Sequence, residues 1–327
     1  MNEIRRVGVF TSGGDAPGMN ACVRAAVRAA LANDLEVIGI RRGYAGMIEQ
    51  DFVEMDGRSV SNIVQKGGTI LKSARSERFR TPEYRAVAAE NLREAGIDGL
   101  VAVGGDGTLQ GAVAFYEEHR IPTVGCPGTI DNDLFGTDET IGYDTALNTA
   151  LENIDRIRDT ADAHDRLFLI EVMGRDAGFI ALNCAISGGA EMVLIPETLS
   201  DLDKIKERIY SLMSSHARSS IVVVAEGEEL GGARMIEQAL RTDEAFAHVD
   251  LRVCILGHTQ RGGSPTARDR VLASRLGAAA VEALLEGHAN VMVGLVGGEI
   301  RLTPMRKVWS RKKTINYELL KLTQLLS

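Results

Sequence analysis

A glycine-rich segment with a single aspartate, Gly104–Thr108, follows the apolar run Leu100–Val103 and precedes a predicted helix. Consecutive glycines after a buried strand let backbone N–H groups approach an anion, and the positive end of the next helix points to the same place. The carboxylate of Asp106 would repel a phosphate there unless a divalent cation lies between them. The segment therefore predicts a magnesium-nucleotide site and phosphoryl transfer. A glycine turn with a helix-capping aspartate is the alternative.

A second segment of this kind, Thr11–Gly18, follows the first apolar run and precedes a helix that carries Arg24 and Arg28. Gly14 can bring its backbone N–H close to a phosphate, because it has no side chain to keep the ligand away. The segment predicts a second place for an anion. A tight connection between strand and helix is the alternative.

Two carboxylates and a hydroxyl lie together in the segment Pro127–Asp133. Asp131 and Asp133 are two residues apart, so an extended backbone projects them to the same side. One can accept the proton of an attacking hydroxyl group while the other orients that group or reaches the metal ion. Thr129 adds a donor for a phosphoryl oxygen. A turn rich in aspartate and asparagine is the alternative.

Arginines follow glycines at two further places. Arg75 lies beyond Gly67 and Gly68, and Arg175 follows Met173 and Gly174 at the end of a predicted strand. The planar guanidinium group suits the oxygens of a phosphoryl group in transfer.

The segment Leu256–Pro265 combines His258, Arg261 and two adjacent glycines between a strand and a helix. Together with Arg252 it predicts a sugar-phosphate site. The alternative is that His258 is a buried structural residue near a domain hinge.

These segments follow predicted strands, and short β-branched runs alternate with helical patterns along the chain. The predicted strands are 6–10, 36–40, 100–103, 123–126, 167–172, 192–195, 221–225, 253–256 and 291–296; helices include 20–32, 82–95, 145–158, 203–214 and 266–285. This order predicts an α/β fold with largely parallel sheets flanked by helices, in which ligands bind at the carboxyl ends of strands.

The composition is that of a globular enzyme with small-molecule partners. The chain has 327 residues, enough for two domains, and its 37 basic and 45 acidic residues give a net charge of −8. This balance argues against a general role with nucleic acid or membrane surfaces. The sequence shows neither a signal peptide nor an apolar run of about 20 residues, so we expect a cytoplasmic protein. Four widely spaced cysteines predict free thiols.

Taken together and in this order, the segments resemble the bacterial-type ATP-dependent 6-phosphofructokinases (phosphofructokinase family A) over nearly the whole chain. The matching segments are Thr11–Asn20, Gly67–Arg75, Gly104–Thr108, Pro127–Asp133, Ile154–Thr160, Glu171–Arg175 and Leu256–Pro265. The resemblance implies a glycolytic kinase that transfers the γ-phosphoryl group of Mg-ATP to the 1-hydroxyl of fructose 6-phosphate, which gives fructose 1,6-bisphosphate and ADP.

The resemblance also implies two Rossmann-like lobes with the active site in the cleft between them. Residues 1–140 and 259–302 would form the larger, ATP-binding lobe, and residues 141–258 and 303–327 the smaller, sugar-phosphate-binding lobe.

The resemblance implies a role for each matching residue. Asp131 would be the general base, and Asp106 would hold Mg²⁺. The reacting groups would also meet Thr129, Asp133, Arg75, Arg175 and the backbone of Gly14. ATP would lie along Gly14, Tyr44, Arg75, Arg80, Gly105, Asp106, Gly107, Thr108 and Gly111. Fructose 6-phosphate would meet Thr129, Asp131, Arg166, Met173, Gly174, Arg175, Glu226, Arg252, His258 and Arg261. Family members place the matches of Arg166 and Arg252 in a neighbouring subunit's site, which implies a homotetramer with shared active sites.

Two glycines bear on the phosphoryl donor. Pyrophosphate-dependent relatives commonly carry aspartate at the position of Gly107 and lysine at that of Gly128. Side chains there would fill the space that the α-phosphate of ATP needs, so glycine at both favours ATP. A pyrophosphate-dependent enzyme is the alternative.

The sequence departs from the family at the site for allosteric effectors such as ADP or phosphoenolpyruvate. Arg24, Arg28, Arg158 and Glu191 match that site. Gly57 stands where an arginine is usual, Asn62 replaces an aspartate, and Ser215 and Ala217 take places often held by basic residues. Arg58 and Arg218 lie one residue away. Fewer charge-assisted contacts predict a weak or altered effector response. Strong activation by ADP at low concentration would contradict this prediction.

Two other functions stay open. NAD kinases and diacylglycerol kinases share the Gly104–Thr108 pattern, so a kinase for another hydroxyl group is one of them. The other is a non-catalytic sensor of nucleotides or sugar phosphates, although such a protein has no chemical need for a base at Asp131.

Overall fold

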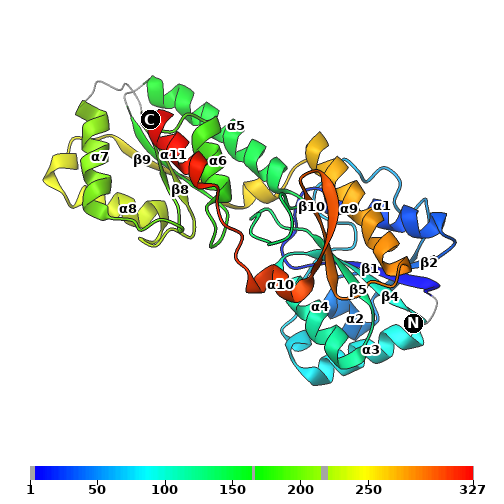
Figure 1. The fold of residues 1–327 in the computed structure, drawn as a ribbon. Helices are drawn as coiled ribbons and strands as arrows, with labels where there is room; N and C mark the ends of the chain where they lie inside the picture. Colours follow the sequence, from blue (N-terminus) through cyan, green and yellow to red (C-terminus); the bar gives the residue numbers. More distant parts are fainter. Residues whose placement is uncertain (1–3, 164–165, 215–219, 327) are drawn as a thin grey trace. The chain divides into compact units, whose positions relative to one another are not determined.

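The computed structural model describes residues 4–163, 166–214 and 220–326. The chain packs into two compact units (Figure 1). One contains Met1–Ile130, Leu134–Thr145 and Arg261–Lys313, and the other contains Asp131–Asp133, Ala146–Gln260 and Thr314–Ser327. The lobe boundaries near 140, 258 and 302 stay a prediction from the sequence.

The first unit is built on a seven-stranded sheet in the order β11-β10-β5-β4-β1-β2-β3. Its strands are β1 (Arg6–Ser12), β2 (Glu36–Ile40), β3 (Phe52–Met55), β4 (Gly99–Gly104), β5 (Thr123–Pro127), β10 (Val291–Val296) and β11 (Glu299–Pro304). The inner strands pair in parallel, and β3 and β11 close the two edges as antiparallel strands. Every residue of β4 is buried, as expected for an inner parallel strand.

Helices cover this sheet. They are α1 (Met19–Ala32), α2 (Tyr44–Glu49), α3 (Pro82–Glu94), α4 (Asp106–His119), α9 (Ala267–Leu285) and α10 (Met305–Ser310), with the short η1 (Arg78–Arg80). Helices α1 and α9 lie side by side (Figure 1). A methyl group at Gly277 of α9 would come within 2.4 Å of the carbonyl oxygen of Cys22, so this helix pair needs glycine at its contact.

The second unit has a four-stranded, wholly parallel sheet in the order β7-β8-β6-β9. Its strands are β6 (Leu167–Val172), β7 (Met192–Leu194), β8 (Ser220–Ala225) and β9 (Leu251–Ile255). Its helical segments are α5 (Tyr143–Asp162), whose first residues belong to the first unit, α6 (Phe179–Ser187), α7 (Leu202–Ser214), α8 (Gly232–Arg241), η2 (Glu244–Phe246), η3 (Gly257–Arg261) and α11 (Tyr317–Leu326). In α8, Ala233, Ile236 and Leu240 form one buried face.

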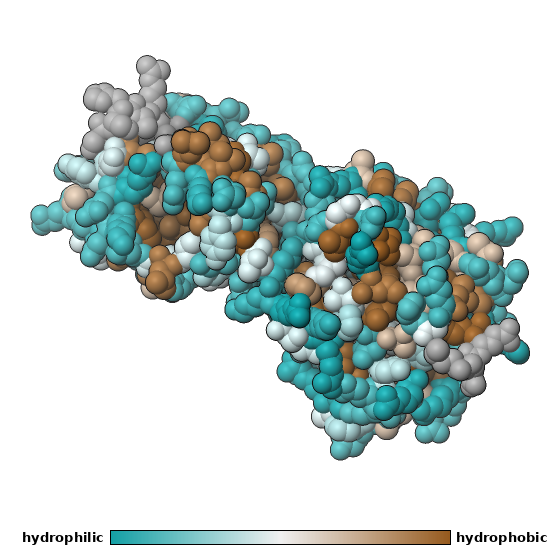
Figure 2. Space-filling view, in the orientation of Figure 1, coloured by the Kyte–Doolittle hydropathy of each residue, from teal (hydrophilic) through white to brown (hydrophobic). Residues whose placement is uncertain are grey.

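The predicted α/β fold with largely parallel sheets flanked by helices is confirmed. Hydrophilic side chains cover most of the surface that Figure 2 shows on each unit. Among the described residues, no helix combines the length and apolar character that a membrane crossing requires. The four cysteines are free, and Cys22, Cys126 and Cys184 are buried.

Candidate functional site

The two predicted phosphate segments of the first unit are joined by a hydrogen bond. Thr108 Oγ1 donates to the carbonyl oxygen of Ser12 over 3.1 Å in a buried position. A methyl group at Gly104 would lie 2.4 Å from this hydroxyl, so glycine leaves room for the bond. Ser12 and Gly104 are also direct neighbours in the pairing of β1 with β4. The two segments therefore lie together at the carboxyl edge of the sheet.

Asp106 is the first residue of α4, and one of its carboxylate oxygens is available to bind a cation. Its Oδ2 accepts a hydrogen bond from Gln110 Nε2 at 2.7 Å. Its Oδ1 is buried and has no hydrogen-bond partner within the described part of the chain. A hard oxygen at the head of a helix fits Mg²⁺, which is commonly held by one carboxylate, phosphate oxygens and water. No three acidic, histidine or cysteine side chains of the described ranges gather as a metal site.

Gly14 lies against Arg261. A methyl group at Gly14 would come within 2.8 Å of Arg261 Nη1, and that nitrogen donates to the carbonyl oxygen of Asp15 at 3.3 Å. A methyl group at Gly67 would lie 2.2 Å from the carbonyl oxygen of Gly263. The structure thus brings the predicted nucleotide residue Gly14 next to the predicted sugar-phosphate residue Arg261.

Tyr44 contacts the phosphate segment through a hydrogen bond to its backbone. Its side chain is buried, its hydroxyl donates to the carbonyl oxygen of Thr108 at 2.5 Å, and its ring stacks on Phe79 with 3.9 Å between the centroids. Burial raises the pKa of the Tyr44 hydroxyl well above its usual range, so this group stays a donor. A methyl group at Gly111 would lie 2.9 Å from the ring, which explains the glycine in α4.

The arginines predicted for ATP lie at the surface of the same unit. Arg80 is exposed at the end of η1 and pairs with Glu77 over 3.2 Å. Arg75 is exposed in the segment before η1. Both side chains are accessible to a ligand.

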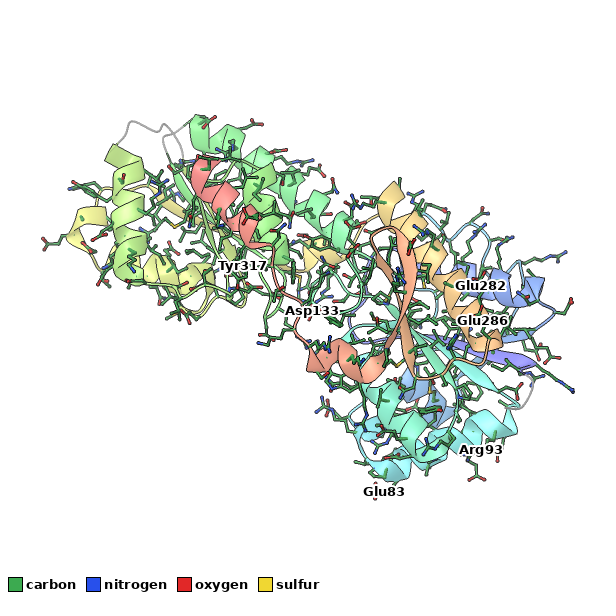
Figure 3. The ribbon with its side chains drawn as sticks, in the orientation of Figure 1. Glu83, Arg93, Asp133, Glu282, Glu286 and Tyr317 are labelled. Atoms are coloured by element: carbon green, nitrogen blue, oxygen red, sulfur yellow. The ribbon has the colours of Figure 1, made fainter. Side chains whose placement is uncertain are left out.

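The segment after β5 continues from the phosphate segment. Gly128 N–H donates to the carbonyl oxygen of Gly104 at 3.0 Å, and Thr129 lies against Gly105, where a methyl group would be 3.4 Å from its Cβ. Asp131, the predicted base, follows two residues later and is 6% exposed. Asp133 lies in the same loop, where Figure 3 labels it.

In the second unit, predicted sugar-phosphate residues lie at the carboxyl ends of β6, β8 and β9. Gly174 N–H and Arg175 N–H both donate to Glu226 Oε1, at 3.3 Å and 2.7 Å. Arg175 has a φ of 54° and Gly174 a φ of 148°. His258 lies in η3 and is exposed. A residue that the sequence reasoning missed, Gln260, accepts a hydrogen bond from Met173 N–H at 2.8 Å.

Arg166 and Arg252 lie at the amino ends of the strands of this sheet, opposite the carboxyl ends just described. Arg166 precedes β6, Arg252 is the second residue of β9, and Asp250 bonds the Nε of both, at 2.7 Å and 2.9 Å. The Arg166 guanidinium lowers the pKa of Asp250. Along β6 the amino end of the strand is roughly 20 Å from Met173 at about 3.3 Å per residue, so within one chain the two arginines are not brought to Met173, Gly174 and Arg175.

The predicted effector residues are divided between the units. Arg158 donates through Nη2 to the carbonyl oxygens of Gly188 and Gly189, at 2.7 Å and 2.6 Å, and pairs with Glu191 over 3.4 Å. Arg24 and Arg28 lie on α1 of the first unit, and Gly57, Arg58 and Asn62 lie in turns of the same unit. Ser215, Ala217 and Arg218 lie outside the described residues.

The two glycines of the donor argument have different surroundings. A methyl group at Gly107 would meet nothing within 4 Å. At Gly128 it would lie 3.0 Å from side-chain atoms of Met19 and Val103 and 3.2 Å from the backbone nitrogen of Gly104. A side chain at position 107 therefore extends into open space, whereas one at position 128 meets packed atoms.

Comparisons with known proteins agree with these features. A sequence profile described as "Phosphofructokinase" matches residues 6–284. The chain is 58% identical to an ATP-dependent 6-phosphofructokinase of Cytophaga hutchinsonii, covering 99% of this chain and 98% of that relative. It is 59% identical to ATP-dependent 6-phosphofructokinase 1 of Thermus thermophilus, covering 99% and 100%.

Solved structures show the same fold. A phosphofructokinase of Saccharomyces cerevisiae superposes with a TM-score of 0.85 at 36% identity, over 98% of this chain and 46% of that longer one. A pyrophosphate-dependent phosphofructokinase of Marinobacter aquaeolei has a TM-score of 0.82 at 22% identity, over 96% and 86%, which shows the fold alone. The resemblance seen in the sequence is confirmed: the chain belongs to the phosphofructokinase family.

Proposed function

We propose that the protein is a glycolytic ATP-dependent 6-phosphofructokinase, which converts fructose 6-phosphate and Mg-ATP into fructose 1,6-bisphosphate and ADP. The observation that carries this proposal is the buried Oδ1 of Asp106, which has no hydrogen-bond partner in the described ranges. Asp106 is the first residue of α4, beside the two glycine segments that the Thr108–Ser12 hydrogen bond joins. The ATP-dependent 6-phosphofructokinases at 58% and 59% identity support the choice of substrates.

In this proposal, Asp131 accepts the proton of the 1-hydroxyl group as its oxygen attacks the γ-phosphorus, and the bond from that phosphorus to the leaving ADP breaks. Asp106 would hold Mg²⁺, which would offset charge on the phosphate oxygens. Gly14 N–H and the guanidinium groups of Arg75 and Arg175 stabilise the phosphoryl group in transfer.

Further residues bind the two substrates. Thr129 and Asp133 border the reacting groups. Arg80, Gly105, Gly107, Thr108 and Gly111 lie along ATP, with Tyr44 beneath Thr108. Met173, Gly174, Glu226, His258 and Arg261 bind fructose 6-phosphate.

We further propose that Arg166 and Arg252 complete the site of a neighbouring copy in a homotetramer. Support comes from their position at the amino edge of the second unit's sheet, whereas Met173–Arg175 lies at the carboxyl edge. A hexose phosphate is too short to contact both the amino and the carboxyl ends of the strands of one sheet.

ATP is the proposed donor because Gly107 leaves open space in the first turn of α4. We also propose that the enzyme works in the cytoplasm and that its response to nucleotide or phosphoenolpyruvate effectors is weak or altered.

The exchange Asp131→Ser tests the proposed base. We expect turnover to fall by about 10²–10⁴-fold, the usual contribution of a general base, because the rest of the site remains. Calorimetric titration should show fructose 6-phosphate binding within about threefold of the wild type, since Asp131 acts mainly in the transition state. The exposed Asp155 of α5 provides the control Asp155→Ser, which should leave both quantities unchanged. An undiminished rate in Asp131→Ser would reject the role.

A further inference from the structure

Directly after β6, three consecutive backbone N–H groups donate hydrogen bonds to side chains. Met173 N–H donates to Gln260 Oε1 at 2.8 Å, and the N–H groups of Gly174 and Arg175 donate to Glu226 Oε1. Glu226 directly follows β8, and Gln260 lies in η3 after β9. Side chains beyond both neighbouring strands therefore fix the segment that carries Arg175.

Gln260 is completely buried, with 0% of its surface exposed. Its amide orientation follows from chemistry, because a backbone N–H can only donate and so must face the carbonyl oxygen Oε1. The other end of the amide, Nε2, has no hydrogen-bond partner in the part of the chain that the structure describes.

This unpaired amide argues against a purely stabilising role. A buried donor without an acceptor destabilises the folded state by an amount comparable to what one hydrogen bond contributes. A methionine of similar shape would avoid that penalty while losing the bond to Met173. The free energy of folding alone therefore gives little reason for glutamine at this position.

The segment that Gln260 holds has an unfavourable backbone conformation. Arg175 adopts a φ of 54°, in the left-handed region, which is strained for a residue with a side chain. Gly174 adopts a φ of 148°, which favours glycine. Such a turn persists only where its surroundings hold it. Glu226 holds the turn itself, and Gln260 fixes the last residue before it.

We propose that Gln260 is a positioning residue for sugar-phosphate binding: its Oε1 fixes Met173 N–H, and thereby orients Gly174 and Arg175 before the substrate arrives. This inference rests on the proposed function, because it assigns Met173–Arg175 to fructose 6-phosphate. A segment ordered in advance spares the ligand the conformational entropy of ordering it.

The exchange Gln260→Met tests the inference in the full-length enzyme. We expect kcat/KM for fructose 6-phosphate to fall by about tenfold, as for the loss of one buried hydrogen bond, while KM for ATP stays within about twofold. The melting temperature should change little, because the exchange also removes the unpaired amide. Gln260→Glu keeps the acceptor for Met173 N–H and should restore kcat/KM to within about threefold of the wild type. Gln238→Met, on the exposed face of α8, is the matched control.

An unchanged kcat/KM for fructose 6-phosphate in Gln260→Met would overturn the inference. So would an equal loss for both substrates with a large fall in melting temperature, because that pattern describes a structural residue. Failure of Gln260→Glu to restore activity would show that the acceptor for Met173 is not what matters. If the wild type makes no product from fructose 6-phosphate, the proposed function itself fails, and this inference fails with it.

Discussion

Several glycines of the proposed site are explained by a neighbouring group that a side chain would displace. Gly14 leaves room for the guanidinium of Arg261, Gly104 for the hydroxyl of Thr108, and Gly111 for the ring of Tyr44. The approaches at Gly14 and Gly111 link segments that are distant in the sequence, and the room at Gly104 lets Thr108 bond to Ser12. At the scale of single residues, the glycines of the first unit's site therefore leave the space that neighbouring side chains need.

This arrangement predicts the effect of Gly14→Ala. The added methyl group would come within 2.8 Å of Arg261 Nη1, and the flexible arginine would move more easily than the backbone. We expect KM for fructose 6-phosphate to rise by about tenfold, as for the loss of one charge-assisted hydrogen bond of at least 1.4 kcal/mol. Steady-state kinetics measure it. Gly57→Ala is the control, because a methyl group there meets nothing within 4 Å. An unaltered KM would show that Arg261 does not bind the sugar phosphate.

Sequence reasoning selected residues by their chemical type and by their position after strands. It placed Gly14, Asp106 and Thr129 correctly at the end of strands of one sheet. It missed Gln260 and Asp250, whose partners lie 87 and 84 residues away in the chain. A glutamine or aspartate that bonds across a sheet has no local pattern, so such contacts needed the structure.

At the scale of elements, one buried carboxylate joins two helices. Asp269, in the first turn of α9, accepts hydrogen bonds from Gly142 N–H at 2.8 Å and from both the N–H and the hydroxyl of Thr145. These donors belong to the start of α5, whose first N–H groups lack partners within the helix. Asp269 therefore caps α5, while Thr266 caps α9 itself.

This cap predicts a pH-dependent stability. Burial raises the pKa of Asp269 from 3.8 to about 6 in the folded protein. Because the folded pKa lies above the unfolded one, this group's stabilisation is complete below about pH 3.8 and is lost as the pH rises through about 6. Asp269→Asn removes the titration. The difference in free energy of unfolding, wild type minus variant, should fall by roughly 1 kcal/mol between about pH 5 and 7.5 in urea denaturation. A difference that does not vary with pH would contradict the assignment.

The inner parallel strands were predictable because they are continuous apolar runs, as in β4 and β8, where every residue is buried. The antiparallel edge strands β3 and β11 were missed. In β11, Glu299, Arg301 and Leu302 are exposed, and its last residue is a proline, so no apolar pattern marks it. Edge strands are defined by the partner they pair with more than by their own composition.

At the scale of the whole molecule, the proposal requires more than one copy of the chain. Arg166, Asp250 and Arg252 form a cluster with a net positive charge at the amino edge of the second unit's sheet. Ligand sites of α/β sheets lie at the carboxyl edge, where Met173–Arg175 is found. A cationic cluster at the amino ends of the strands is explained if it binds the substrate of a neighbouring copy.

Mixing two inactive variants tests this explanation. In a mixture of Asp131→Ser and Arg252→Ala chains, dissociated and reassembled together, about one quarter of shared sites would combine an intact Asp131 from one chain with an intact Arg252 from another. We therefore expect activity to recover toward about one quarter of the wild type, measured as product formation after reassembly. If both residues act within one chain, reassembly restores nothing.

The central claim is tested most directly by following fructose 1,6-bisphosphate formation from fructose 6-phosphate and Mg²⁺, with ATP and pyrophosphate compared as donors at equal concentration. Gly107→Asp belongs in the same assay, because the open space at position 107 lets the new side chain enter without distorting α4. The account predicts product with ATP alone for the wild type and a loss of ATP use in Gly107→Asp. Product mainly with pyrophosphate would contradict the assigned donor, and no product with either donor would contradict the proposed function.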